Sequence, residues 1–357
     1  MSPARTRPPA GSLDGRWALR WLECAQELLR GAAPRLDRMN VFPVADADTG
    51  SNMLATLTAA AEGARAVLAE GTPADLGAVL DGAGRAALDC ARGNSGTLLA
   101  VALDGLAPPL AGVAALTTVD LAAAARGADT AARRALSDPR EGTILSVLTV
   151  AADTLTRAAQ AGRTPAEAAA ATVGEALQAV AETESLLAPL SRAGVVDAGA
   201  VGVLWTLEAL RATLAGAPVD EDLAARLHGY ADGPARPAPE GRTAEDADGP
   251  GPEAGVEVMC TVRLTPVGAA SVRRALEQVG DAVILAPASR TPDADGLVPW
   301  RVHVHVPQAQ EALDVIAASG RPEQVAVTAL TDTDHRHGVA SPESAGTSPD
   351  TGSGRGR

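Results

Sequence analysis

The sequence contains no lysine, and every one of its 30 Lys/Arg positions is an arginine. P-loop nucleotide-binding proteins place a lysine over the phosphates, and protein kinases place one on their third strand. Neither class can therefore describe this chain. Any phosphate group that it binds must be met by metal ions, backbone N–H groups or arginine.

Cysteine and long apolar runs are also scarce. The three cysteines, Cys24, Cys90 and Cys260, are odd in number and far apart, which does not make a disulfide framework. No uncharged apolar stretch reaches about 18 residues, so no transmembrane helix is expected. Residues 1–12 lack an apolar run followed by a cleavage signal, so no signal peptide is expected. A net charge of −14 disfavours a nucleic-acid partner, and the cytoplasm is the expected location.

The chain nevertheless has the length and the apolar content of a folded protein with two domains, at 357 residues and 46% hydrophobic. Residues 13–216 are rich in Ala and Leu, and their apolar positions recur at helical spacing. Short connections favour antiparallel neighbours, so this part predicts an all-α bundle. The expected helices span residues 13–33, 50–70, 76–92, 95–107, 117–137, 141–161, 165–183 and 199–216.

The pattern changes after the helical part. Residues 231–253 are rich in Pro, Gly and acid, as linkers are. Residues 254–330 predict a small α+β domain in the order strand, helix, strand, strand, helix, strand, which is typical of a ferredoxin-like fold. These elements are expected at 256–264, 270–279, 281–286, 298–306, 309–319 and 324–330. Residues 338–357 are rich in Gly, Ser and Pro and are expected to be a disordered tail.

The motif with the clearest chemistry is the stretch NVFPVADADTGSNM, residues 40–53. Asp46 and Asp48 are two positions apart in a predicted turn, where their carboxylates can share a hard cation. The residues that follow open a helix, whose free N–H groups and positive dipole end suit an anion. An alternative is that these acids only cap the helix. The motif by itself leaves both interpretations open.

Three further helix starts carry glycine together with oxygen-bearing side chains, at residues 92–96, 141–143 and 197–200. In an up-and-down bundle, alternate helices begin at the same end. The four motifs open the second, fourth, sixth and eighth helices, so we expect them to gather on one rim. Four unrelated turns are the alternative.

The stretches NVFPVADADTGSNM, ARGNSG, EGTIL and AGVVDAGAVG resemble the four signature blocks of the DhaL-type domain of dihydroxyacetone kinases. The version in bacterial fatty acid kinases is the most similar. The resemblance implies an eight-helix barrel that binds ATP or ADP with two Mg²⁺ ions, with Asp46 and Asp48 as metal ligands. The residues implied to border the nucleotide are Thr49, Gly50, Ser51, Asn52, Met53, Gly93, Asn94, Ser95, Gly96, Thr143, Asp197 and Gly199.

The sequence departs from the family pattern at three positions in the first motif. Ala47 replaces the glycine between the acids, and Ala45 replaces a proline. Asn40 stands where dihydroxyacetone kinases carry a third acid; its amide can still bind Mg²⁺ but adds no charge. Ala47 matters if the turn needs a positive φ, which costs a non-glycine residue about 1 kcal/mol or more.

A second cluster of candidate ligands lies in the α+β domain. His303 and His305 alternate along one predicted strand and share a face. Cys260 lies in the first strand, which is adjacent to the third in a βαββαβ sheet, so a thiolate and two imidazoles could converge as in catalytic zinc sites. Solvated histidines and a buried apolar cysteine are the alternative. Residues 254–330 also resemble the middle domain of fatty acid kinases, which implies Zn²⁺ on Cys260, His303 and His305.

The expected function is that of an ATP-dependent kinase, fatty-acid-kinase-like, which forms an acyl phosphate on a carrier-bound fatty acid. The helical part has neither histidine nor lysine, so metal electrostatics should dominate, and a carboxylate acceptor needs no base. Fatty acid kinases have a third domain, which residues 331–357 cannot form. A glycerone (dihydroxyacetone) kinase-like enzyme and a non-catalytic nucleotide sensor are alternatives. A fatty-acid-binding carrier protein is the expected partner, and a homodimer is open.

Overall fold

The computed structural model describes residues 13–70, 75–113, 115–234 and 255–330. Most of the expected linker and all of the expected tail lie outside the described residues. Within them, no helix combines the length and the apolar character that a membrane crossing needs.

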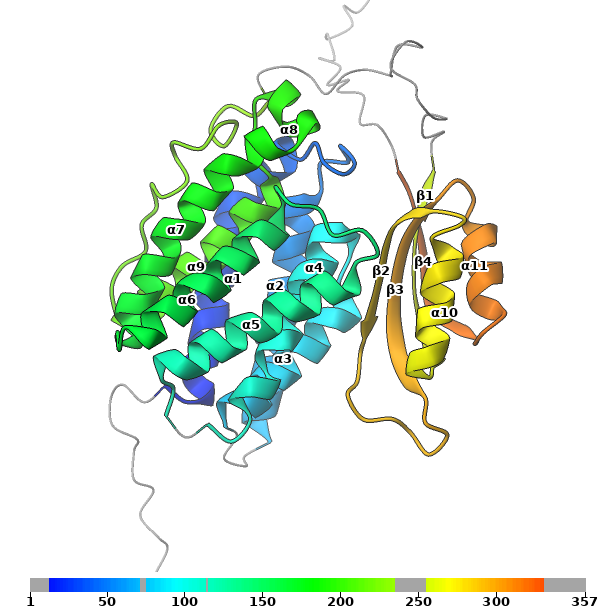
Figure 1. The fold of residues 1–357 in the computed structure, drawn as a ribbon, viewed down its shortest axis with the longest axis horizontal. Helices are drawn as coiled ribbons and strands as arrows, with labels where there is room; N and C mark the ends of the chain where they lie inside the picture. The colour runs from blue at the N-terminus through cyan, green and yellow to red at the C-terminus, as the bar shows by residue number, and fades with distance from the viewer. Residues whose placement is uncertain (1–12, 71–74, 114, 235–254, 331–357) are drawn as a thin grey trace, which may run out of the picture.

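The N-terminal domain is helical, with long helices at all the positions that the sequence predicts (Figure 1). They are α1 (Gly15–Arg38), α2 (Thr49–Ala69), α3 (Leu76–Cys90), α4 (Gly93–Leu106), α5 (Thr118–Ala135), α6 (Ile144–Gln160), α7 (Pro165–Leu186) and α9 (Ala198–Ala215). Two short elements were not predicted, the 3₁₀ turn η1 (Pro108–Leu110) and the helix α8 (Ala188–Ala193).

The first helix is longer than predicted, because it continues through Pro34. A proline inside a helix removes one backbone hydrogen bond. The extra turn buries Leu36 and Met39 completely, which offsets that loss. Arg38 also donates a hydrogen bond to the Pro34 carbonyl at 2.8 Å. The continuation carries the chain to the turn that holds Asp46 and Asp48.

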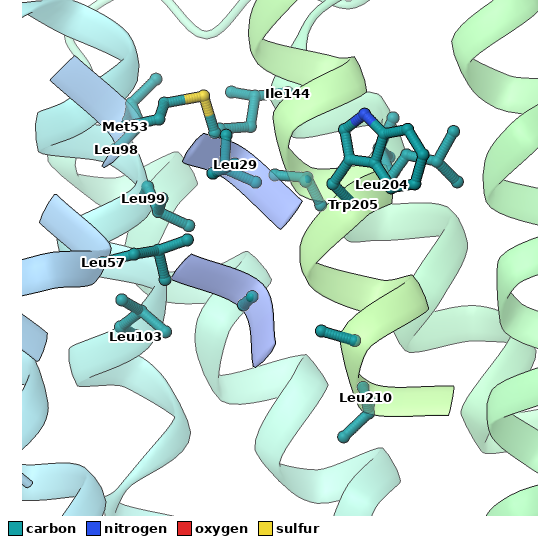
Figure 2. Close-up of a cluster of buried hydrophobic side chains, with 14 of the residues drawn as sticks. Leu29, Met53, Leu57, Leu98, Leu99, Leu103, Ile144, Leu204, Trp205 and Leu210 are labelled. Atoms are coloured by element: carbon teal, nitrogen blue, oxygen red, sulfur yellow. The ribbon is translucent and has the colours of Figure 1, made fainter. Parts of the chain in front are cut away.

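Small residues let these helices pack closely around an aliphatic core. Side chains from α1, α2, α4, α6 and α9 meet in it, among them Leu29, Met53, Leu99, Ile144 and Leu204 (Figure 2). Gly50 at the start of α2 lies against α1, where an added Cβ would come within 2.4 Å of the Ala33 carbonyl oxygen. The glycine thereby fixes the position of α2 against α1.

The C-terminal domain has the predicted order of strands and helices. Its elements are β1 (Val256–Leu264), α10 (Pro266–Leu276), β2 (Asp281–Pro287), β3 (Val298–Val306), α11 (Ala309–Ala317) and β4 (Pro322–Ala329). The strands form one sheet in the order β2-β3-β1-β4, and each neighbouring pair is antiparallel.

The two faces of this sheet have different partners. One face packs on α10 and α11 through an apolar cluster that includes Val258, Cys260 and Val302. The other face is turned toward the helical domain, and Ile284 and Ala286 of β2 join the helical core (Figure 1). The sheet therefore lies between the helical domain and its own two helices.

Polar contacts hold the two domains together. Arg273 of α10 donates to the carbonyls of Arg134 and Ala135, at 2.7 and 3.1 Å, at the end of α5 where the helix dipole favours a cation. Arg290 pairs with Asp104 of α4 at 2.7 Å. The N–H of Ser137 donates to the Val283 carbonyl at 3.1 Å on the free edge of β2.

Candidate nucleotide and metal site

Asp46 and Asp48 lie in the turn between α1 and α2, and neither is needed to cap α2. Asp48 occupies the N-cap position, but its side chain makes no capping hydrogen bond. Asp37 of α1 does this instead: its carboxylate accepts from the N–H and the hydroxyl of Ser51, at 2.9 and 2.7 Å. Helix capping therefore does not explain the acidic pair.

The electrostatics of the two carboxyls favour a bound cation. Burial raises the pKa of Asp46. Burial and then the neighbouring Asp46 charge raise the pKa of Asp48 to about 7. Asn40 donates from Nδ2 to Asp46 Oδ1 at 2.5 Å, so it orients this carboxylate. A divalent ion would relieve the repulsion, and two carboxylates are the oxygen ligands that Mg²⁺ prefers.

Magnesium affinity should depend on pH in a defined direction. Asp48 must be ionised to bind the ion, and in the metal-free protein it holds its proton until about pH 7. We therefore expect Mg²⁺ affinity to rise about tenfold per pH unit from pH 5.5 to 7 and to level off above pH 7.5. Titrations at several pH values measure this. A profile flat down to pH 5 would contradict the raised pKa.

The residue between the two acids is strained. Ala47 has φ of 55°, in the left-handed region that costs an alanine about 1–2 kcal/mol. Ala47→Gly should therefore raise the free energy of unfolding by about 0.5–1 kcal/mol, after the entropy that glycine adds to the unfolded chain. Denaturant unfolding tests this. Ala45→Gly is the control, since Ala45 has no positive φ, and it should give no gain.

The four helix starts lie next to one another, as the alternation of helix directions predicts. An added Cβ at Gly93 would lie 2.4 Å from Asn52 Nδ2, which joins the starts of α4 and α2. One at Gly199 would lie 3.1 Å from Ser95 Oγ, which joins α9 to α4. The Ile144 N–H lowers the pKa of Asp197, so the start of α6 lies beside that of α9. Each of the four helix starts thus lies next to another of them, and α2 begins beside the acidic pair.

Asp197 lies between the starts of α9 and α6. Its carboxylate accepts from the Ala200 N–H at 2.7 Å and so caps α9, and the Ile144 N–H at the start of α6 lowers its pKa. Burial raises the pKa of Asp197 to about 7, and the two N–H donors oppose that rise. Thr143, the N-cap of α6, accepts from the Leu145 N–H at 3.3 Å.

Two residues that the family resemblance placed beside the nucleotide are buried between helices. Met53 has no exposed surface and lies over Gly202, whose added Cβ would lie 2.4 Å from the methionine sulfur. Gly50 is buried against the α1 backbone. Ser51 is exposed, and Asn52, Asn94 and Ser95 are partly exposed. Those side chains are accessible to a ligand.

The metal-binding cluster of the sheet has a different membership from the predicted one. Glu257, His303 and His305 lie together, with one potential ligand atom of each within 4.8 Å of the others. The prediction that Cys260 joins the histidines is wrong. Cys260 pairs with Val302 and faces the helices α10 and α11, whereas Glu257 pairs with His305 and faces the helical domain.

The sequence contained the signal that separates these two faces. In β1 the apolar residues alternate through Val258, Cys260 and Val262, and in β3 through Val302 and Val304. The polar alternation contains Glu257 in β1 and the histidines in β3. Because each face of a sheet keeps one set, Cys260 belongs with the valines and Glu257 with the histidines.

His303 is buried and lacks hydrogen-bond partners. His303 has no exposed surface, and neither of its ring nitrogens has a hydrogen-bond partner. Its Nδ1 lies 3.0 Å from Glu257 Oε1, although the two do not meet hydrogen-bond geometry. An unpartnered buried imidazole beside a carboxylate and a second imidazole fits a divalent ion, and two nitrogens with one oxygen suit Zn²⁺. Three protein ligands leave a fourth position open.

The charges in this cluster are consistent with a cation site. Burial raises the pKa of Glu257, but His303, His305 and the Gly93 N–H lower it by more, so the net shift is downward. Burial, and then the neighbouring His303, lower the pKa of His305 to about 4, which keeps this ring neutral and able to bind a metal.

The sequence of this chain matches known families over both domains. Residues 43–212 match the DAK2 domain family, and residues 253–337 match the family of FakA-like middle domains of fatty acid kinases. The chain therefore carries a DAK2 (DhaL-type) domain followed by a FakA-like middle domain. Both are kinase-related families, and DAK2 domains bind nucleotide.

Several bacterial proteins are similar to this chain. Protein YloV of Bacillus subtilis is 33% identical over 210 residues, which are 59% of this chain and 37% of that protein. An uncharacterized protein of Staphylococcus haemolyticus is 32% identical over 192 residues, 54% of this chain and 34% of its own length. The chain thus spans little more than a third of the length of these relatives.

Proposed function

We propose that this protein is an ATP-dependent phosphotransferase that binds Mg²⁺-nucleotide at the rim of its helical domain. The observation that carries this proposal is the pair Asp46 and Asp48, which is not used to cap α2. Its carboxyls have raised pKa values and lie beside the helix N-termini. Helix N-termini attract phosphate, and paired carboxylates attract the metal that accompanies it. No lysine is required.

Each part of the rim has a task in this proposal. Asp46 and Asp48 hold magnesium, and the family resemblance implies two ions. When bound, the magnesium would neutralise charge on the transferring phosphoryl group. The N–H groups at the starts of α2 and α4 orient the phosphates, and α6 contributes the positive end of its helix dipole. Asn40 holds Asp46 in place, and Asp197 holds the starts of α6 and α9 together. Ser51, Asn52, Asn94 and Ser95 offer polar groups to the nucleotide.

We further propose that Glu257, His303 and His305 hold a zinc ion. The buried His303 supports this assignment, because its Nε2 has no hydrogen-bond partner and its Nδ1 lies 3.0 Å from Glu257 Oε1. The sheet order β2-β3-β1-β4 supports a ferredoxin-like fold for this domain, and the eight long helices support a DhaL-type barrel for the other.

The acceptor that fits the family best is the carboxylate of a fatty acid, presented by a fatty-acid-binding carrier protein, with an acyl phosphate as product. Such a carboxylate is already ionised at neutral pH, which suits a rim without histidine or lysine. Glycerone is the alternative acceptor. A non-catalytic nucleotide-binding regulator is favoured by two observations, the strained Ala47 and the neutral Asn40 beside the acids.

One experiment separates these functions. The full chain is incubated with γ-labelled ATP and Mg²⁺, with fatty-acid-loaded carrier protein and glycerone in parallel, and Asp46→Asn as the inactive control. Label transferred to the fatty acid, and absent with Asp46→Asn, is the expected result. Label on glycerone alone would identify the alternative enzyme. Nucleotide binding without transfer to either acceptor would overturn the kinase proposal in favour of a regulator.

A further inference from the structure

Arg301 of β3 is a buried cation without a charged partner in the part of the chain that the structure describes. The residue is only 8% exposed. It donates a hydrogen bond from Nη1 to Thr261 Oγ1 at 3.3 Å, which is long for such a bond. Its Nε is buried and has no hydrogen-bond partner. A guanidinium stays charged at neutral pH, so burying it unpaired is costly.

Other arginines of the same domain show how a guanidinium is satisfied here. Arg273 donates to backbone carbonyls at the end of α5, at 2.7 and 3.1 Å. Arg290 pairs with an aspartate of α4 at 2.7 Å, and Arg263 pairs with an aspartate of its own domain. Arg301 is more deeply buried than Arg263 and Arg290, and it lacks the partner that each of them has. Its environment is therefore built for a charge that the chain itself does not supply.

The strand register places Arg301 on the face of the sheet that is turned toward the helical domain. In the β2–β3 pair, Ala286 is opposite Arg301 and Ile284 is opposite His303. Directly opposite residues share a face, and both Ala286 and Ile284 are buried in the helical core. Arg301 and His303 are two residues apart, so about 7 Å separates their Cα atoms. The guanidinium thus lies at the domain boundary, next to the candidate metal cluster.

The unused edge of this guanidinium has a defined chemistry. Nη1 is directed to Thr261, whereas Nε lies on the other edge, which it forms together with Nη2. This edge presents two parallel N–H groups, and their spacing matches the two oxygens of a carboxylate or a phosphate. Such a pair is stronger in a buried site than in water, because the local dielectric constant is lower. The shape and the charge both favour an oxyanion.

We propose that Arg301 binds an oxyanion, a carboxylate or a phosphate group, at the domain boundary beside the cluster of Glu257, His303 and His305. This site goes beyond the proposed function, because it requires neither a bound metal ion nor phosphoryl transfer. Within the proposed function the oxyanion has two sources. One is the carboxylate of the phosphoryl acceptor, and the other is a phosphate of the nucleotide.

Thermal melting of the full chain, with and without an added oxyanion, tests this site. The protein is first treated with a chelating resin, so that no metal ion binds the anion in place of Arg301. Sodium phosphate and sodium butyrate are added separately, and sodium chloride at equal ionic strength is the reference. A ligand that binds only the folded state raises Tm, and we expect a rise of about 2–4 °C at roughly ten times the Kd of the anion.

Three variants show whether the rise in Tm comes from Arg301. Arg301→Met removes the charge and keeps most of the volume, so it should lose the rise and, without oxyanion, melt no lower than the wild type. Arg301→Lys keeps the charge but lacks the two parallel N–H groups, so it should lose most of the rise. It replaces the methionine variant if that variant does not fold. Arg263→Met is the matched control and should keep the rise, because Arg263 is already paired with Asp293. Phosphate stabilises proteins in general, and that effect is common to all variants.

Calorimetry of ADP–Mg²⁺ binding separates the two sources. Affinity lowered at least about tenfold in Arg301→Met assigns the oxyanion to the nucleotide, since one charge-assisted pair is worth that much. Unchanged affinity assigns it to the acceptor. A rise in Tm that is equal in the wild type and in Arg301→Met, or no rise in the wild type with either anion, would overturn the site. A wild type that binds no nucleotide would contradict the proposed function alone, because melting tests the site without it.

Discussion

Replacing Asp48 with asparagine should lower Mg²⁺-dependent ADP affinity at least about 100-fold, while the helical domain stays folded. An amide offers one neutral oxygen in place of a charged carboxylate, and a bound metal ion contributes several kcal/mol of charge stabilisation in sites of this kind. The side chain makes no capping bond, so α2 does not depend on it. Calorimetry measures the affinity, and circular dichroism measures the fold.

Asp37 provides the matched control. It caps α2 through Ser51, so Asp37→Ala should lower the free energy of unfolding by about 0.5–2 kcal/mol. Its carboxylate is engaged with Ser51, so Mg²⁺-dependent affinity should change by only a few-fold. Reversed results, with affinity lost in the Asp37 variant and kept in the Asp48 variant, would show that the wrong acid has been assigned to the metal.

Replacing His303 with alanine should abolish zinc binding. Loss of an outer-shell partner already costs metal sites about 10–100-fold in affinity, and the loss of a ligand should cost more. The zinc content of protein dialysed against zinc, measured by elemental analysis, should fall from about one ion per chain in the wild type to none in the variant. The fully buried position of His303 makes thermal melting a necessary companion measurement.

Cys260 is the matched control for this second prediction. The residue is buried on the opposite face of the sheet, among Val258, Val262 and Val302. Burial raises the pKa of its thiol to about 11, so a thiolate is disfavoured there at neutral pH. Cys260→Ala should therefore keep its zinc and lose only some stability. Zinc lost from the Cys260 variant and retained by the His303 variant would contradict the assignment of ligands.

The long helices could be predicted from sequence because apolar periodicity and helix-start residues agree over many turns. The six elements of the second domain could be predicted because segments with the periodicity of strands alternate with segments that have the periodicity of helices. The six-residue helix α8 could not, since it is too short to show a period. The true end of α1 could not either, because proline normally marks an end and only the burial of Leu36 and Met39 continues the helix.

The candidate site was predictable in its location and less so in its members. Helix parity brings four helix starts together without any knowledge of side chains. Parity does not say which residues of a start face outward, so Met53 was placed beside the nucleotide although it packs over Gly202. Alternation in β1 and β3 gives two faces, but the family resemblance favoured Cys260. The pairing register is what selects Glu257.

Four helix N-termini should converge on one Mg²⁺-nucleotide, and amide hydrogen exchange tests this convergence most directly. Exchange is compared with and without ADP–Mg²⁺ at the starts of all the long helices. We expect slower exchange at the starts of α2, α4, α6 and α9, and no change at the starts of α5 and α7. Protection confined to one helix start, or spread equally over α5 and α7, would contradict the claim.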